Sequence, residues 1–135
     1  MSKTAGYSGT PLHKKLGFKP GMTVGVIAAP EHYCVLLADA EEVSFSFKAG
    51  DGPFDAVHLF LPAPADIAAQ SKDAIAKLNP GGMLWISWAK KSSKLHAGVT
   101  EDDLRTAVLP LGWVDVKVCA VDTDWSALKF LKRKS

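Results

Sequence analysis

The sequence has few of the residues and patterns that identify the common functional classes of protein. Of its 135 residues only two are cysteines, and Cys34 and Cys119 do not have the spacing of metal ligands. We expect two buried free thiols, as in a reducing compartment, instead of a disulfide. No apolar run approaches the roughly 20 residues that a membrane-spanning helix needs. The first residues also lack the apolar segment of a signal peptide. These absences favour a cytoplasmic protein that does not enter a membrane.

Strong charge and known catalytic motifs are also missing. The formal net charge is +2, which is too small to indicate a nucleic-acid-binding protein, although basic residues gather near the C-terminus. The four histidines are scattered without the i, i+4 spacing of a helical zinc motif, so we expect no metal site. Neither a Gly-x-Ser-x-Gly sequence nor a phosphate-binding loop occurs. His58 lies inside an apolar run, and we expect it to be a hydrogen-bonded core residue.

The centre of the chain has the pattern of a strand, a helix and a second strand. Residues 55–61 and 82–88 are almost continuously apolar, and residues 64–78 between them have helical spacing. Two apolar strands joined by a helix form a parallel crossover unit, and such strands are usually covered on both faces. We expect residues 79–82, which include a proline and two glycines, to end the helix.

The remaining segments extend this unit into one α/β domain that covers residues 1–135. The patterns predict helices over 10–17, 31–38 and 100–111, a strand over 22–28, a half-buried edge strand over 43–47, and strands over 113–121 and 125–132. The last two strands are close enough to form an antiparallel hairpin. We therefore predict three layers around a mostly parallel sheet of about six strands. Residues 1–18 would form an arm with a short helix, and residues 131–135 a basic tail.

This layout resembles the class I methyltransferase version of the Rossmann fold, in a truncated form. The resemblance is carried by Lys19-Pro-Gly21, by residues 52–57 and 78–84, and by the terminal hairpin. The chain is also similar to a small bacterial family catalogued as a domain of unknown function, through residues 5–12, 88–92 and 117–126. The first resemblance implies S-adenosylmethionine as a cofactor, whereas the second implies the fold and no established activity.

The loop that would hold this cofactor does not have the expected residues. It reads Ile27-Ala-Ala-Pro-Glu31, without the glycines that let a backbone approach a ligand closely. Pro30 has no backbone N–H, and Glu31 would take the positive end of the helix dipole where an anion would otherwise bind. The acidic residue expected for a ribose has only Asp51 as a candidate, and Asp51 is also explained by a turn. We therefore predict no cofactor, with S-adenosylmethionine kept as an alternative.

A lysine-rich loop after the strand over 82–88 is the best candidate binding site. In parallel α/β sheets, ligands bind beyond the carboxyl ends of the strands. Lys90, Lys91 and Ser92 could there hold an anion, because lysines attract negative charge and a serine hydroxyl can donate to phosphate or carboxylate oxygens. The site requires Lys90 and Lys91 to lie at the same edge of the sheet as Ala29 and Pro62. The alternative is an ordinary solvated loop.

Three further residues could complete such a site. Trp88 precedes the lysines and could flank a flat ligand, and Tyr7 and Ser8 of the N-terminal segment could cover it. Each also has a simpler explanation, since tryptophan often fills a core and the arm could merely cap a helix. The leading hypothesis is a small protein that binds a small anionic or nucleotide-like ligand without methyl transfer. The alternatives are an S-adenosylmethionine-dependent methyltransferase with an atypical first loop, or a non-catalytic interaction module, such as a homodimer through the hairpin's edge strand.

Overall fold

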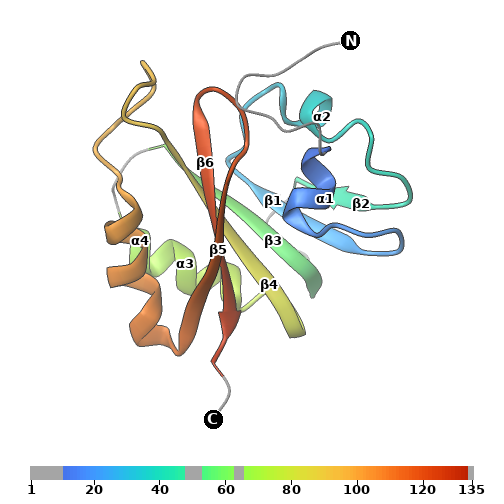
Figure 1. The fold of residues 1–135 in the computed structure, drawn as a ribbon. Helices are drawn as coiled ribbons and strands as arrows, with labels where there is room; N and C mark the ends of the chain where they lie inside the picture. Colours follow the sequence, from blue (N-terminus) through green and yellow to red (C-terminus); the bar gives the residue numbers. More distant parts are fainter. Residues whose placement is uncertain (1–10, 48–52, 63–65, 134–135) are drawn as a thin grey trace.

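The computed structural model describes residues 11–47, 53–62 and 66–133, and these form one mixed sheet with helices on both faces (Figure 1). The strands lie in the order β2-β1-β3-β4-β6-β5. The first four are parallel to one another, β6 is antiparallel to β4, and β5 is antiparallel to β6. The predicted α/β sheet with a closing antiparallel hairpin is therefore confirmed. The strands are β1 Thr23–Ile27, β2 Ser44–Ser46, β3 Phe54–Leu61, β4 Leu78–Ala89, β5 Trp113–Ala120 and β6 Trp125–Lys132.

Within the described residues, two helices cover each face of the sheet. On one face lie α1 (Leu12–Leu16) and α2 (Tyr33–Leu36), and on the other lie α3 (Ile67–Ile75) and α4 (Glu101–Val108). A short 3₁₀ helix, η1 (Leu109–Leu111), continues α4 and takes up Pro110, and Gly112 ends it with a left-handed backbone. Helix α4 begins with a capping box, in which the Thr100 and Asp103 side chains each accept a hydrogen bond from the other residue's backbone N–H.

Strand β3 explains why the centre of the sequence is continuously apolar. Its side chains alternate between the two cores, with Ala56 and Phe60 in the core beneath α1 and α2, and Val57, Leu59 and Leu61 in the core beneath α3 and α4. Both cores exclude solvent, so neither face of the strand accepts exposed polar residues. Trp85 of β4 belongs to the first core and donates its indole N–H to the carbonyl oxygen of Leu16 at 2.9 Å, which ties α1 to the sheet.

Two helices are shorter than the sequence pattern predicts. The segment expected to form a helix over 31–38 has only the four residues of α2, and Glu31 and His32 precede it. Tyrosine, cysteine and valine are weak helix formers, so packing of the buried Tyr33 and Leu37 decides the length. Helix α3 ends at Ile75, and β4 already begins at Leu78. Residues 79–82, which were expected to end the helix, instead belong to β4 and form a bulge opposite Asp55.

The two cysteines are free, but their burial differs from the expectation. Cys34 is exposed, because α2 turns Tyr33 inward and therefore points its neighbour outward. Cys119 is half-buried on β5, where burial raises the pKa of its thiol. The expectation of two buried thiols is therefore wrong for Cys34.

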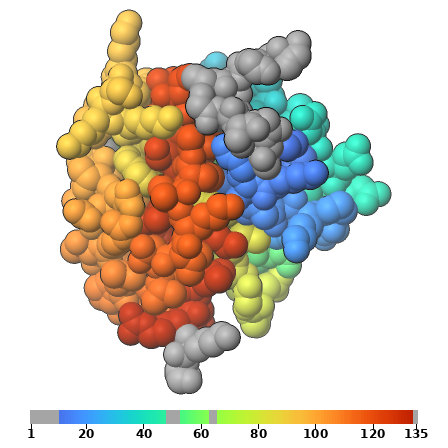
Figure 2. All heavy atoms as spheres, viewed as in Figure 1, coloured from blue at the N-terminus to red at the C-terminus, as the bar shows by residue number. Residues whose placement is uncertain are grey.

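The C-terminal hairpin forms one side of the molecule. Its strands cover the middle of the face drawn in Figure 2, between the segment after β4 and the N-terminal helix α1. Strand β6 continues to Lys132, so the expected basic tail over 131–135 begins within a strand. Among the described residues no helix combines the length and apolarity needed to cross a membrane.

Candidate functional site

The carboxyl ends of three parallel strands meet at one edge of the sheet. β1, β3 and β4 are neighbours in parallel register, so Ala29, Pro62 and Lys90 follow their strands at the same edge. This is the arrangement that the sequence-based hypothesis requires. Only β3 separates β1 from β4, so the ends of these two strands lie about 10 Å apart. Two hollows open at this edge.

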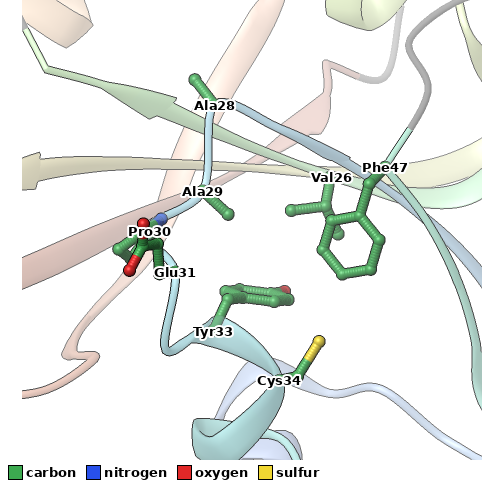
Figure 3. Close-up of a pocket in the computed structure, with 8 residues that line it drawn as sticks. All are labelled: Val26, Ala28, Ala29, Pro30, Glu31, Tyr33, Cys34 and Phe47. Carbon is green, nitrogen blue, oxygen red and sulfur yellow. The ribbon is translucent and has the colours of Figure 1, made fainter.

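The first hollow lies beside the loop that follows β1 (Figure 3). It has a volume of about 400 Å³ and is lined by Val26, Ala28, Ala29, Pro30, Glu31, Tyr33, Cys34 and Phe47. The rings of Tyr33 and Phe47 meet edge to face with their centroids 6.0 Å apart, and the Cys34 thiol points toward the space beside them. Among the described residues that line this hollow there is no lysine or arginine, and Glu31 carries the only formal charge of these residues. This described part of the lining disfavours an anion.

The backbone of this loop partly makes up for its missing glycines. Ala28 has a φ of +61°, a left-handed conformation that a glycine adopts without steric cost. The chain therefore bends sharply after β1 at a position where a glycine would be expected. Pro30 still offers no N–H, and the Glu31 side chain remains at the hollow.

A buried hydrogen-bonded chain supports the first hollow from inside the protein. The Tyr33 hydroxyl and the His58 Nδ1 are 3.0 Å apart, and the His58 Nε2 and the Ser87 Oγ are 2.7 Å apart. Burial raises the pKa of Tyr33 and lowers the pKa of His58 to about 3, so both side chains are neutral near pH 7. His58 is thus the hydrogen-bonded core residue that the sequence predicts.

A second contact fixes the loop after β1 to the distant hairpin. The Nε2 of His32 lies 2.7 Å from Oδ2 of the buried Asp122. The other carboxylate oxygen of Asp122 accepts from the backbone N–H groups of Asp124 and Trp125. No sequence signal could have found this pair, because its members belong to elements that only the sheet order brings together.

The second hollow lies between the end of β4 and the start of α4. It has a volume of about 420 Å³ and is lined by Trp88, Lys91, Val99, Thr100, Glu101, Asp102 and Arg105. Two residues proposed from the sequence, Trp88 and Lys91, therefore line one hollow. Lys90 and Ser92 are adjacent in the chain but do not line it, and the Lys90 backbone N–H donates to the carbonyl oxygen of Asp124. Tyr7 and Ser8 lie outside the described residues.

The two cations of the second hollow differ in their partners. Arg105 donates to Asp115 at 3.0 Å, to Asp102 at 3.2 Å and to Glu101, and the hydrogen bond to Asp115 is the main cause of the raised Arg105 pKa. Lys91 has no hydrogen-bonded or ion-paired partner within residues 11–47, 53–62 and 66–133. This role of Arg105 was not predicted from the sequence, although the i, i+4 spacing of Glu101 and Arg105 is a usable signal.

Trp88 lines the second hollow as a buried aromatic residue, and its indole N–H is a hydrogen-bond donor without a protein partner among the described residues. The residue is only 8% exposed. Its indole N–H has no partner in the described part of the chain, where the only fully enclosed side-chain nitrogen or oxygen without a partner is that of Trp125. The Trp88 N–H is therefore not fully enclosed, and Trp88 is one of the residues that line the hollow. Among the described residues no three histidine, cysteine or acidic side chains come together as a metal site would require.

Comparisons with known proteins identify the fold. The sequence matches no protein-family model and no curated protein, so the resemblance to the bacterial family of unknown function stays a prediction. Solved methyltransferase structures do share the fold. One is the Burkholderia thailandensis 1,6-didemethyltoxoflavin N1-methyltransferase with bound S-adenosylhomocysteine, at a TM-score of 0.57 and 16% identity over 91% of this chain and 75% of that one.

Two further enzymes give the same result. The N-methyltransferase NodS from Bradyrhizobium japonicum matches at a TM-score of 0.56 and 11% identity, over 95% of this chain and 100% of that one. Magnesium protoporphyrin IX methyltransferase from Synechocystis, with bound S-adenosylmethionine, matches at a TM-score of 0.55 and 14% identity, over 90% of this chain and 74% of that one. At identities this low the likeness shows the fold alone. The chain has a methyltransferase-like α/β fold.

Proposed function

We propose that this chain, which has the fold of the class I methyltransferases, binds a small anionic or nucleotide-like ligand at the carboxyl edge of its sheet and does not transfer a methyl group. The second hollow receives the anionic group. Lys91 binds it and the indole of Trp88 flanks it. Lys90 and Ser92 add positive charge and a hydroxyl close by in the chain, and Tyr7 and Ser8 cover the ligand.

The observation that carries this proposal is the pairing of Trp88 and Lys91 in one hollow. Both residues present a donor without a protein partner in the described ranges, and an unused donor beside a concave surface is a typical ligand contact. A lysine and an indole N–H both donate and neither accepts, so the group they bind must supply hydrogen-bond acceptors. Phosphate and carboxylate groups do so.

The first hollow supports the absence of methyl transfer. In dinucleotide-binding folds, the loop after the first strand binds its ligand through backbone N–H groups and a free helix N-terminus. Here Pro30 removes one of these donors, Glu31 adds negative charge, and α2 has only four residues. A cofactor with a carboxylate would therefore meet repulsion at this loop.

Thermal-shift titration tests the proposal with AMP and inorganic phosphate as probes. A ligand that binds only the native state adds about 2.7 kcal/mol to the free energy of unfolding at one hundred times its Kd, which raises Tm. Lys91→Gln should weaken the response. Lys94→Gln is the matched control, because Lys94 is an exposed lysine of the same loop that does not line the hollow. If the ligands raise Tm equally in the two variants, Lys91 is not part of the binding site.

S-adenosylmethionine binding in the first hollow is the second candidate function. The hollow lies beside the left-handed turn at Ala28, and its walls carry two aromatic rings that could stack on a base. If this candidate is correct, S-adenosylmethionine raises Tm and Phe47→Ala abolishes the rise. No rise at millimolar cofactor would count against it.

The interaction-module alternative depends on the edge strand β5. Strand β5 is the last in the sheet order, and its Val116 and Val118 are about half exposed. However, its pairing with β6 is interrupted between Asp115 and Lys117, and such bulges protect edges from pairing with other chains. A dilution-stable monomer in sedimentation would reject a homodimer through β5.

A further inference from the structure

The charges around the second hollow do not suit a ligand that is only negative. Its lining contains Lys91 and Arg105, but also the carboxylates of Glu101 and Asp102. Arg105 is shared between these two carboxylates and Asp115, so one guanidinium faces three negative charges. An anion bound by Lys91 would therefore sit beside carboxylates that are only partly neutralised. Like charges placed close together oppose binding.

The carboxylates of Asp102 and Glu101 can also accept hydrogen bonds from a ligand. The Asp102 side chain is 91% exposed and uses one oxygen, Oδ1, for Arg105 at 3.2 Å. Its second oxygen has no partner among the described residues. Glu101 is 38% exposed. The hollow thus combines free acceptors from the first turn of α4 with free donors from the end of β4.

Trp88 shows that this combination is more than an acidic helix end. The side chain is more than nine-tenths buried, lines the hollow, and has an indole N–H without a partner in the described ranges. Trp88 thus gives the lining a second donor besides Lys91, and an aromatic ring in addition to the charged groups. A ligand for this hollow should therefore carry acceptor oxygens, an ammonium group and an apolar part.

We infer that the ligand of the second hollow is a zwitterion of the α-amino-acid class. Its carboxylate accepts hydrogen bonds from Lys91 Nζ and the Trp88 indole N–H, its ammonium group donates to Asp102 and Glu101, and its side chain packs on the Trp88 ring. This inference rests on the proposed function, because it uses the same anion-binding pair, and it adds the positive group that the pair alone does not require.

Three matched probes distinguish a site for a zwitterion from a site for an anion alone. L-Phenylalanine carries both charges, 3-phenylpropionate carries only the carboxylate, and 2-phenylethylamine carries only the ammonium group. Isothermal titration calorimetry should show phenylalanine binding roughly three- to tenfold more tightly than either, since partly exposed ion pairs contribute about 1 kcal/mol. Glycine and acetate repeat the comparison without the aromatic part.

Variants assign the two charges to their residues. Lys91→Gln should weaken phenylalanine and phenylpropionate alike. Asp102→Asn should weaken phenylalanine and 2-phenylethylamine but not 3-phenylpropionate, so that the ratio of the phenylalanine affinity to the phenylpropionate affinity falls toward one. Asp73→Asn on α3 is the matched control, because it makes the same change on an exposed residue away from the hollow.

The outcomes distinguish failure of the inference from failure of the proposed function. If phenylpropionate binds as tightly as phenylalanine and Lys91→Gln weakens it, the zwitterion is wrong and the anion site stands. If neither carboxylate binds but AMP or phosphate does, and Lys91→Gln weakens that binding, the zwitterion is again wrong and the anion site stands. If none of these probes binds, or Lys91→Gln has no effect on any of them, both proposals are rejected.

Discussion

The burial of His58 leads us to predict that the protein loses stability in mild acid. Its ring is fully buried between Tyr33 and Ser87, and burial lowers its pKa from 6.5 to about 3. Between these two pH values the unfolded chain binds a proton at His58 and the folded chain does not. The free energy of unfolding therefore falls as pH decreases below about 6.5, by about 1.4 kcal/mol per pH unit. At pH 5 the loss from this residue alone is about 2 kcal/mol.

A pair of denaturation series measures this loss. Urea unfolding of the wild type and of His58→Gln at pH 7 and pH 5 gives the free energy that each protein loses. Glutamine can still hydrogen-bond to Tyr33 and Ser87 but does not titrate, so the wild type should lose about 2 kcal/mol more than the variant. Other ionisable groups contribute equally to both proteins and cancel.

Two results would refute this reasoning. Equal losses for wild type and variant would show that His58 does not titrate differently in the two states. If the variant does not fold, NMR of the wild type gives the same information, because the His58 ring resonances should remain constant down to pH 5. A midpoint near 6.5 would contradict the neutral, buried imidazole.

Three further predictions concern the backbone and helix ends. Gly25→Ala should destabilise the protein by about 1–3 kcal/mol, because the new Cβ would lie 2.7 Å from the buried Phe54 ring. Adding Phe54→Leu should recover part of this loss. An unchanged free energy of unfolding in urea for Gly25→Ala would contradict the prediction. Ala28→Gly should raise the free energy of unfolding by up to about 1 kcal/mol, because glycine adopts the left-handed backbone of residue 28 without the steric cost that alanine has. A decrease in Tm in thermal unfolding would contradict this. Thr100→Ala should cost about 1 kcal/mol by breaking the capping box with Asp103, whereas an unchanged urea midpoint would show that the cap contributes little.

Much of the fold could be predicted because its main signals are local. The continuous apolar runs of β3 and β4 identify strands covered on both faces, and the residues that start and end α4 are visible in sequence. The prediction failed where tertiary packing overrides local preference. Helix α2 is shorter than its apolar spacing indicates, in a segment held by the buried Tyr33 and Leu37, and β4 begins before its glycines and bulges opposite Asp55.

The candidate site could be predicted only in part for a similar reason. Trp88 and Lys91 are near neighbours in the chain, so the end of β4 brings them together. Glu101, Asp102 and Arg105 join them only because α4 packs beside that strand end, and their charges change the kind of ligand that the hollow suits. The left-handed backbone of Ala28 could not be predicted, since alanine gives no sign of that conformation.

The most direct test of the proposed binding site follows the indole N–H of Trp88 by NMR. The four tryptophans give four indole resonances, and Trp88→Phe identifies the one that belongs to Trp88. Titration with AMP and with L-phenylalanine should move this resonance, and Lys91→Gln should reduce the shift at equal ligand concentration. The account is contradicted if the Trp88 resonance stays in place with both ligands while S-adenosylmethionine moves backbone resonances of the loop after β1.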